Sequence, residues 1–303
     1  MATVPAMTRA VRRDRSATTG LLFIAPFMAM FLLVLVAPLV YALYLSLFRE
    51  TLVGGTHFVG LDNYVRVAVD PEFWSGVANT LKYGAILIPV IIAGSVVLSL
   101  ALDSPYVRGR TVFRVGLFLP YAFPGIIATL IWGYLYGPVF GPVTQIAHMI
   151  GLPSPDLLGG ALVLFSIANI SVWELLGYKT VIVYAALQTI SPELEEAAVL
   201  DGATHWQYAR YVKVPMVSSA ILLNAIFSII GTLQLYHQPS VLQSMAPAVI
   251  TSGFTPNLYA YNMAFVAQEY NYAGALSFTL GALIAGISFA VIYVGSRKKR
   301  SLQ

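Results

Sequence analysis

The chain has no cysteine and few charged residues. The lack of cysteine excludes disulfide bonds, thiol catalysis and cysteine-ligated zinc. Only 10% of the 303 residues are Asp, Glu, Lys or Arg, whereas about 25% is typical of soluble domains. Hydrophobic residues make up 58% of the chain. This composition predicts a membrane protein rather than a large soluble domain.

Sequence motifs for catalysis and for ATP binding are also missing. A phosphate-binding P-loop needs Gly, four residues and then Gly-Lys-Ser/Thr, but the nearest match, Gly177–Thr180, has no Gly before Lys179. The histidines show no paired metal-ligand spacing. The sequon at Asn169 lies inside an apolar run, so we expect no glycosylation there. We therefore predict no catalytic residues, no metal site and no cofactor bound by this chain.

Six apolar runs predict an all-α polytopic membrane protein with one transmembrane domain, residues 1–303. A helix needs about 20 apolar residues to cross about 30 Å of hydrocarbon. The first run is about twice as long as the 7–15 residues of a signal peptide's apolar region, so we expect it to stay as a membrane helix. A basic tail, residues 1–18, precedes it, and an amphipathic connector, residues 49–82, follows it. The expected spans are residues 19–48, 83–102, 115–136, 158–187, 216–236 and 272–295.

Lys and Arg placement predicts the orientation of these spans, because cytoplasmic loops are enriched in both residues. If both termini are cytoplasmic, the outer side holds only Arg49, Arg66 and Lys82. The cytoplasmic side then holds thirteen basic residues: Arg9, Arg12, Arg13, Arg15, Arg108, Arg110, Arg114, Arg210, Lys213, Arg297, Lys298, Lys299 and Arg300. The clusters lie beside apolar runs, which indicates membrane orientation and not nucleic-acid binding.

The segment 191–215 is polar and lies between two apolar runs, the fourth and the fifth. Ser191 can cap a helix that has Pro192 at its first position and acidic residues in its first turns. Gly202 accepts the left-handed conformation that ends helices. Thr204 can cap a second short helix. The segment therefore predicts a helix–turn–helix on the cytoplasmic side.

This segment resembles the EAA loop of permease subunits in bacterial ABC importers. That pattern has EAA, three residues, Gly, nine residues and Ile-x-Leu-Pro; here the corresponding residues are 196–198, Gly202 and 212–215. The departures are Val212 and Val214, which keep the apolar character. The resemblance implies that the loop docks on an ATPase and transmits ATP-driven motion through these residues: Glu195, Glu196, Ala197, Ala198, Asp201, Gly202, Ala203, Trp206 and Pro215.

The resemblance extends over nearly the whole chain and is to the sugar-importer permeases of the MalF/UgpA type. The stretches APLVYALYLSLF, VGLDNYVRV and FRVGLFLPYAFPGIIATLIW support it. It implies half of a translocation path for a sugar or sugar-like solute in the bacterial cytoplasmic membrane. It also implies three partners: a second permease subunit, an ABC ATPase dimer that holds ATP and Mg²⁺, and an extracytoplasmic solute-binding protein.

Two charges, Glu174 and Lys179, lie inside the fourth span, where each costs roughly 2.5–3.5 kcal/mol to insert. They are about 140° apart around a helix and about 7.5 Å apart along it, so we expect no direct pairing. Lys179 could extend toward the cytoplasm. Glu174 either lines the path or makes a structural bond between helices. The residues expected along a sugar path are polar or aromatic: Trp132, Asn169, Trp173, Glu174, Tyr178, Asn224 and Gln234.

Two other functions remain open at this point. One is an ABC importer for another solute, such as glycerol phosphate or a polyamine. The other is a membrane enzyme or an ungated channel that needs no ATPase. Copurification with an ATP-binding chain would separate the importers from this second group.

Overall fold

The computed structural model describes residues 14–51 and 54–300, so Arg9, Arg12 and Arg13 lie outside the described residues. Within this part of the chain, five helices are long and apolar enough to cross a membrane, and a bent pair makes a sixth candidate. The candidate spans are Gly20–Ser46, Pro71–Asp103, the pair Arg110–Ala122 and Gly125–Leu135, Val163–Leu187, Ser218–Leu242, and Tyr270–Val291. The all-α membrane architecture expected from the sequence is confirmed.

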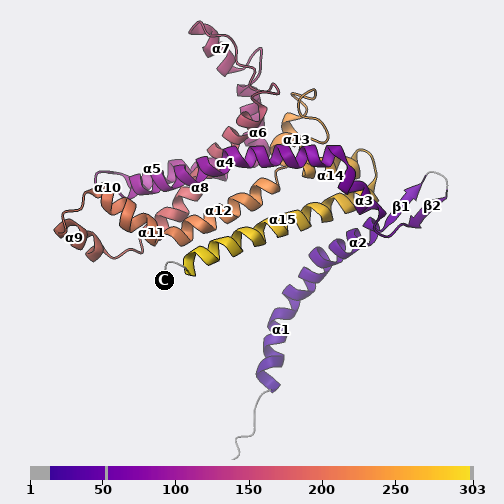
Figure 1. Cartoon of the computed structure of the whole chain (residues 1–303), viewed down its shortest axis with the longest axis horizontal. Helices are drawn as coiled ribbons and strands as arrows, with labels where there is room; N and C mark the ends of the chain where they lie inside the picture. Colours follow the sequence, from indigo (N-terminus) through magenta and orange to yellow (C-terminus); the bar gives the residue numbers. More distant parts are fainter. Residues whose placement is uncertain (1–13, 52–53, 301–303) are drawn as a thin grey trace, which may run out of the picture.

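A bundle of long helices forms the body of the molecule (Figure 1). Its members are α4 (Pro71–Asp103), α8 (Val163–Leu187), α12 (Ser218–Leu233) and α15 (Tyr270–Arg300). The helices α4 and α8 pack along each other, and α12 contacts both. Ile91 of α4 and Ile167 and Ile170 of α8 are fully buried in the main core. The bundle thus has an apolar centre in which α8 is the most enclosed helix.

The first hydrophobic helix diverges from the bundle (Figure 1). It consists of α1 (Asp14–Phe31), a π-helical turn (Leu32–Val36) and α2 (Ala37–Ser46). Every side chain from Gly20 to Phe31 is exposed, and α2 packs on α15. Because the apolar side chains of Gly20–Phe31 are exposed, this surface is suited to lipid or to another apolar chain.

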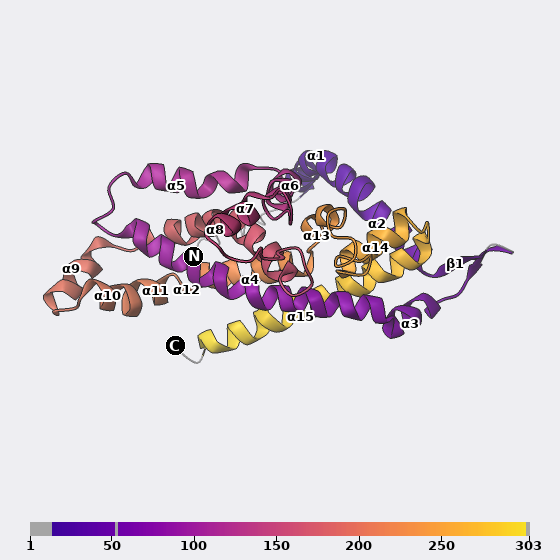
Figure 2. The same cartoon turned by 90° about the horizontal axis from the view of Figure 1, so that it is seen from above.

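The connecting elements gather at the two ends of the bundle. Figures 1 and 2 place α9 (Pro192–Leu200) and α10 (His205–Tyr208) at one end, where α15 also finishes. We call this the loop end. The opposite end, which we call the far end, carries the hairpin of β1 (Phe48–Thr51) and β2 (Gly55–Phe58), α3 (Asp62–Val69) and α14 (Pro256–Phe265). The hairpin is antiparallel, with Arg49 opposite His57.

Asp70 joins the helices at the far end. Its carboxylate accepts hydrogen bonds from the backbone N–H groups of Glu72 and Phe73 and so caps α4. It also accepts hydrogen bonds from the hydroxyls of Tyr259 (2.8 Å) and Tyr272. Burial raises the pKa of Asp70, but these four hydrogen bonds outweigh it and hold the pKa below its ordinary value. The stabilisation is present above the ordinary carboxyl pKa and is lost as the pH falls through the lower folded-state pKa.

Helix α4 starts at Pro71, earlier than the expected membrane boundary at residue 83. The Asp70 cap and the proline at the first helical position explain this start. Residues 71–82 of the expected connector are therefore helical. Helix α8 starts at Val163 rather than at residue 158, after a Gly-rich turn. The region 237–271, between the fifth and sixth expected spans, contains α13 (His237–Leu242) and α14.

The third apolar run forms a bent pair of helices rather than one straight span. Its first arm is α5 (Arg110–Phe118) with a 3-10 turn, and its second arm is α6 (Gly125–Leu135); they differ in direction by 93°. Pro120 and Pro124 lie at the break, where proline removes a backbone donor and disfavours helix in the preceding residue. Beyond α6, α7 (Pro142–Met149) projects away from the bundle (Figure 1).

The arm α5 and its turn pack on α8 at Gly177. A Cβ atom at Gly177 would overlap the backbone carbonyl of Leu117, which cannot move without displacing the helix. Glycine is therefore required at this crossing. By contrast, a Cβ at Gly116, on the same arm, would meet nothing within 4 Å.

We predict that Gly177→Ala destabilises the protein by about 1–3 kcal/mol, because overpacking forces the backbone to move. The control is Gly116→Ala, which adds the same methyl group to open space. Thermal unfolding of the purified protein in detergent measures both. Equal melting temperatures for the two variants would contradict this account of the crossing.

Candidate functional site

The segment 191–215 folds into short helices, as its residues predict. Ser191 occupies the N-cap position of α9, but its side chain makes no capping hydrogen bond; Pro192 takes the first helical position and Glu193 lies in the first turn. Thr204 forms a reciprocal capping box with Gln207 at the start of α10. The predicted Thr204 cap is therefore confirmed.

Gly202 makes the turn between the two helices. Its φ of +79° lies in the left-handed region, as predicted, and no atom lies within 4 Å of the position that a Cβ would take. The N–H of Ala203 bonds to the carbonyl of Ala198 at 2.9 Å, and the Gly202 N–H bonds to Val199 at 3.0 Å. These bonds satisfy the carbonyls that end α9. A side chain at residue 202 would strain the backbone without a steric clash.

The outer surface of this segment carries exposed apolar side chains. Leu200 is 89% exposed, and Trp206 and Tyr211 are each 69% exposed. Exposed apolar groups that cluster on a polar segment mark a protein interaction site. Trp206 was among the residues expected to contact an ATPase, whereas Leu200 and Tyr211 were not. The position of Leu200, an apolar residue directly before the Asp201-Gly202 turn, could have indicated its exposure. The other expected residues are exposed or half-buried: Glu195, Glu196, Ala197, Ala198, Asp201, Gly202, Ala203 and Pro215.

An ion pair anchors the segment to the bundle. The ammonium of Lys213, which follows α10 in a π-helical turn, lies 2.6 Å from the carboxylate of Asp103 at the end of α4 and 3.7 Å from Glu195. The side-chain amide of Gln188 donates to the same Asp103 carboxylate at 2.7 Å. The side chains of Lys213 and Asp103 are each only 13% exposed. This pair was missed, because Lys213 and Asp103 are 110 positions apart.

The surroundings of Lys213 keep it charged. Burial lowers the pKa of Lys213, but the hydrogen bond to Asp103 and the charges of Asp103 and Glu195 raise it above its ordinary value. Because the pKa of Lys213 is higher in the folded state, its charged form stabilises the fold at any pH below the ordinary lysine pKa. This stabilisation is lost only as the pH rises through the folded-state pKa. Lys213 therefore keeps its positive charge at neutral pH.

A cavity of about 250 Å³ lies within the bundle between α4, α8 and α12. Three of the expected path residues line it: Glu174, Tyr178 and Gln234. The rings of Tyr121 and Tyr178 stack on its wall with centroids 4.4 Å apart. The cavity therefore combines an aromatic face with carboxylate and amide groups.

The other four expected path residues lie outside this cavity. Asn169 donates to the Tyr136 hydroxyl at 2.7 Å, and buried Asn224 donates to the Lys179 carbonyl at 3.0 Å. Trp132 and Trp173 pack edge to face at 5.9 Å. In the described chain these four side chains join helices to one another.

Lys179 also lines the cavity, at its loop-end side. Extension toward the cytoplasm was one possibility for the Lys179 side chain. The structure buries it instead, with the ammonium 5.8 Å from the Tyr178 ring and 5.6 Å from the Phe227 ring. The aromatic faces take the place of water around the charge. No ion pair joins Lys179 to Glu174 among the residues described, as expected from their positions on the helix.

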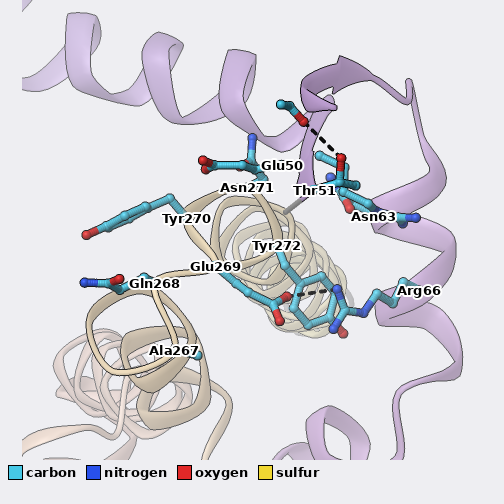
Figure 3. Close-up of a pocket in the computed structure, with 12 residues that line it drawn as sticks. Glu50, Thr51, Asn63, Arg66, Ala267, Gln268, Glu269, Tyr270, Asn271 and Tyr272 are labelled. Carbon is cyan, nitrogen blue, oxygen red and sulfur yellow. Dashed lines mark hydrogen bonds and ion pairs between the residues drawn. The ribbon is translucent and has the colours of Figure 1, made fainter. Parts of the chain in front are cut away.

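A recess of about 940 Å³ lies at the far end, between the hairpin and the start of α15 (Figure 3). One wall holds Arg66, whose guanidinium lies 3.8 Å from the Tyr272 ring centroid and 2.9 Å from the Glu269 carboxylate. Gln268 on the opposite rim has a φ of +60°, a strained conformation for a residue other than glycine. Sequence reasoning missed this recess, because its walls are about 200 residues apart in the chain.

The fold and the site define a class of protein. A polytopic bundle holds a largely apolar cavity with a few polar groups on its wall and carries an exposed, anchored segment at one end, which is the arrangement of a transport permease. No cluster of three or more metal-ligating side chains occurs in the described ranges 14–51 and 54–300. The arrangement can enclose a polar solute and receive force from a second protein.

Comparison with known proteins establishes the family. The family described as "Binding-protein-dependent transport system inner membrane component" matches residues 95–299, more than half of the chain. The chain belongs to this family. It is therefore an inner-membrane permease component of such a transport system, as expected from the 191–215 segment.

Individual relatives match along nearly their full length. The chain is 28% identical to the lactose transport system permease LacF of Rhizobium radiobacter, over 92% of this chain and 95% of that protein. It is 30% identical to a probable ABC transporter permease of Sinorhizobium fredii, over 96% of this chain and 95% of that protein. It is 27% identical to the trehalose/maltose permease MalF of Thermococcus litoralis (92% and 94%).

A solved structure shares the fold. It is a chain of a bacterial ABC transporter that imports the acidic polysaccharide alginate; the TM-score is 0.81 at 20% identity, over 94% of this chain and 96% of that one. A second structure is of a bacterial alginate ABC transporter in complex with an alginate pentasaccharide-bound periplasmic protein. Its TM-score is 0.82 at 19% identity, over 95% of this chain and 98% of that chain. These matches show that the chain has the type I permease fold of ABC importers, the fold class that its resemblance to such permeases implies.

We predict that Asp103→Asn loosens segment 191–215, because Lys213 loses its closest anion while half-buried. The free energy of unfolding should fall by about 1–3 kcal/mol, and limited trypsin cleavage at Arg210 should accelerate. Glu193→Gln removes an exposed carboxylate from the same segment and serves as the control. If trypsin cuts the Asp103→Asn variant and the control at the same rate, the anchor is not the Lys213–Asp103 pair.

Proposed function

We propose that this chain is one of two permease subunits of an ATP-driven importer for a sugar or sugar-like solute. The observation that carries the proposal is the exposed 191–215 segment with its buried anchor on α4. The printed functions of the relatives, which include lactose and trehalose/maltose transport, support a sugar-class solute. ATP and Mg²⁺ belong to a partner ATPase dimer, since the chain has no P-loop.

The anchored segment suits the transfer of force to the membrane helices. Leu200, Trp206 and Tyr211 present apolar surface for an ATPase groove. The Lys213–Asp103 pair connects that surface to α4, and the Gln188–Asp103 bond connects the end of α8. A displacement of the segment would therefore move both long helices of the cavity wall.

The cavity suits a polyhydroxylated ring. The stacked pair of Tyr121 and Tyr178 offers an aromatic face, and Gln234 offers an amide donor and acceptor. Its volume of about 250 Å³ is below the roughly 300 Å³ at which small-molecule sites begin. A second permease subunit facing this one would enlarge the enclosed path, which supports pairing with such a subunit.

The far-end recess suits a docking protein, and a solute-binding protein is the partner we propose for it. Charged and polar side chains of both signs rim the recess, among them Glu50, Arg66 and Gln268. The placement of Lys and Arg supports an orientation in which the far end is external and both termini are cytoplasmic.

Two rival functions, an enzyme and an ungated channel, would need no ATPase. An ATP-binding chain that copurifies with this one would exclude both.

We predict that Gly202→Asp uncouples ATP hydrolysis from uptake. A side chain in the left-handed region costs roughly 1–2 kcal/mol, so the angle between α9 and α10 should change. ATPase activity of the purified importer in proteoliposomes should persist while solute uptake per ATP falls at least about tenfold, the factor that 1.4 kcal/mol gives.

Gly109→Asp is the matched control. Gly109 has a φ of +73°, has open space around it and lies at the loop end outside the coupling segment. If this variant loses uptake per ATP as severely as the Gly202 variant, backbone strain in general is responsible and the coupling role of Gly202 is wrong.

We predict that Tyr178→Leu raises the solute concentration for half-maximal uptake by roughly twofold to tenfold, because aromatic contacts contribute about 0.5–1.5 kcal/mol. Tyr41→Leu removes an equally large ring from the exposed face of the first helix and should leave uptake unchanged. Uptake kinetics in whole cells measure both. An unchanged half-saturation value for Tyr178→Leu would remove this ring from the path.

A further inference from the structure

Two short helices pack against α8 beside the cavity. They are α6, the second arm of the bent pair, and α13, which follows α12 (Figures 1 and 2). They pack on each other at Gly133, where a Cβ would come within 2.5–3.1 Å of the side chains of Met245 and Leu242. Because the fit is this close, α6 and α13 form one unit, which we call the crossing unit.

Polar contacts within the membrane span join α8 to this unit. The Glu174 carboxylate lies 3.6 Å from Nε2 of His237 and 3.5 Å from the side-chain amide of Gln238. The same amide donates to the Ser171 hydroxyl at 3.1 Å. A Cβ at Gly125, the first residue of α6, would lie 3.0 Å from the other Glu174 oxygen. One carboxylate therefore contacts the first residues of both crossing helices.

The direction of the Glu174 side chain distinguishes a latch from a solute contact. The side chain is 12% exposed, and both of its oxygens point at the crossing unit. His237 Nε2 is buried and has no hydrogen-bond partner within the described chain. A buried carboxylate is costly without polar partners, so the contacts of Glu174, which is 12% exposed, with His237 and Gln238 stabilise the packing of α8 against α13. These contacts stabilise the arrangement of α8 and the crossing unit that the structure shows.

We propose that Glu174 is a positioning residue that latches the crossing unit over the far side of the cavity and sets how often that side opens. The proposal deepens the proposed function and rests on it, because a latch matters only in a permease that alternates between two open states. The Glu174 carboxylate then acts through His237, Gln238 and Gly125, whereas Tyr178 and Gln234 serve the solute.

A single cysteine can report whether the far side is open. The chain has no cysteine of its own, and Ser228 is a buried residue of α12 that lines the cavity. The experiment uses the complete importer in membrane vesicles, with the partner subunits free of cysteine and Ser228→Cys in this chain. A membrane-impermeant thiol reagent is applied from the far-end side, and the rate of labelling is measured with and without Glu174→Gln.

We expect Glu174→Gln to raise the labelling rate from the far side about tenfold, which corresponds to about 1.4 kcal/mol. His237→Leu removes the other side chain of the contact and should raise the labelling rate by a similar factor. If the Glu174→Gln variant does not assemble, the labelling rate of His237→Leu tests the latch instead. ATP hydrolysis without the binding protein should rise in parallel. Asp62→Asn, an exposed carboxylate of the far end, is the control and should label as the parent does.

Two results would overturn the latch. One is an unchanged labelling rate in both Glu174→Gln and His237→Leu. The other is a higher half-saturating solute concentration in Glu174→Gln with labelling unchanged, which would make Glu174 a solute contact. Failure of the proposed function looks different, since the parent importer itself would then show no ATP-dependent uptake.

Discussion

Hydrocarbon offers polar groups no hydrogen-bonding partner, and this constraint governs the arrangement of α8. The helix carries Ser171, Glu174 and Lys179 at membrane depth, and each of these residues has protein around it. Ser171 accepts from the Tyr83 hydroxyl at 2.7 Å, Glu174 contacts the crossing unit, and Lys179 lies between aromatic rings. Because these groups must stay enclosed, α8 is the helix around which the others assemble.

Helix α4 connects the two functional ends of the molecule. Its 33 residues extend over roughly 50 Å at 1.5 Å per residue. At the far end Asp70 caps it and ties it to Tyr259 and Tyr272; at the loop end Asp103 holds Lys213. A carboxylate at each end thus fixes α4 to the recess proposed for the binding protein and to the segment proposed for the ATPase. The helix offers a direct mechanical connection between them.

Features that depend on neighbouring residues were predicted correctly from the sequence, whereas features that depend on contacts between distant residues were predicted only in part. Thr204 and Gly202 were assigned correctly because capping and left-handed turns depend on neighbouring residues. Pro120 and Pro124 marked the region of the 93° bend but not its angle, since packing on α8 at Gly177 sets the direction of α5. The membrane cavity was only partly anticipated, because helical spacing alone does not tell which face of α8 meets α12.

The sequence by itself determined the class of protein, the apolar helices and the left-handed turn at Gly202, because hydropathy and turn chemistry act over a few residues. Only the tertiary structure decided that Asp103 would meet Lys213, 110 positions away, that Arg66 would meet Glu269, 203 positions away, and that Glu174 would face His237. The physical reason is that ion pairs act over a few ångströms, and distant residues reach that separation only after the helices have packed.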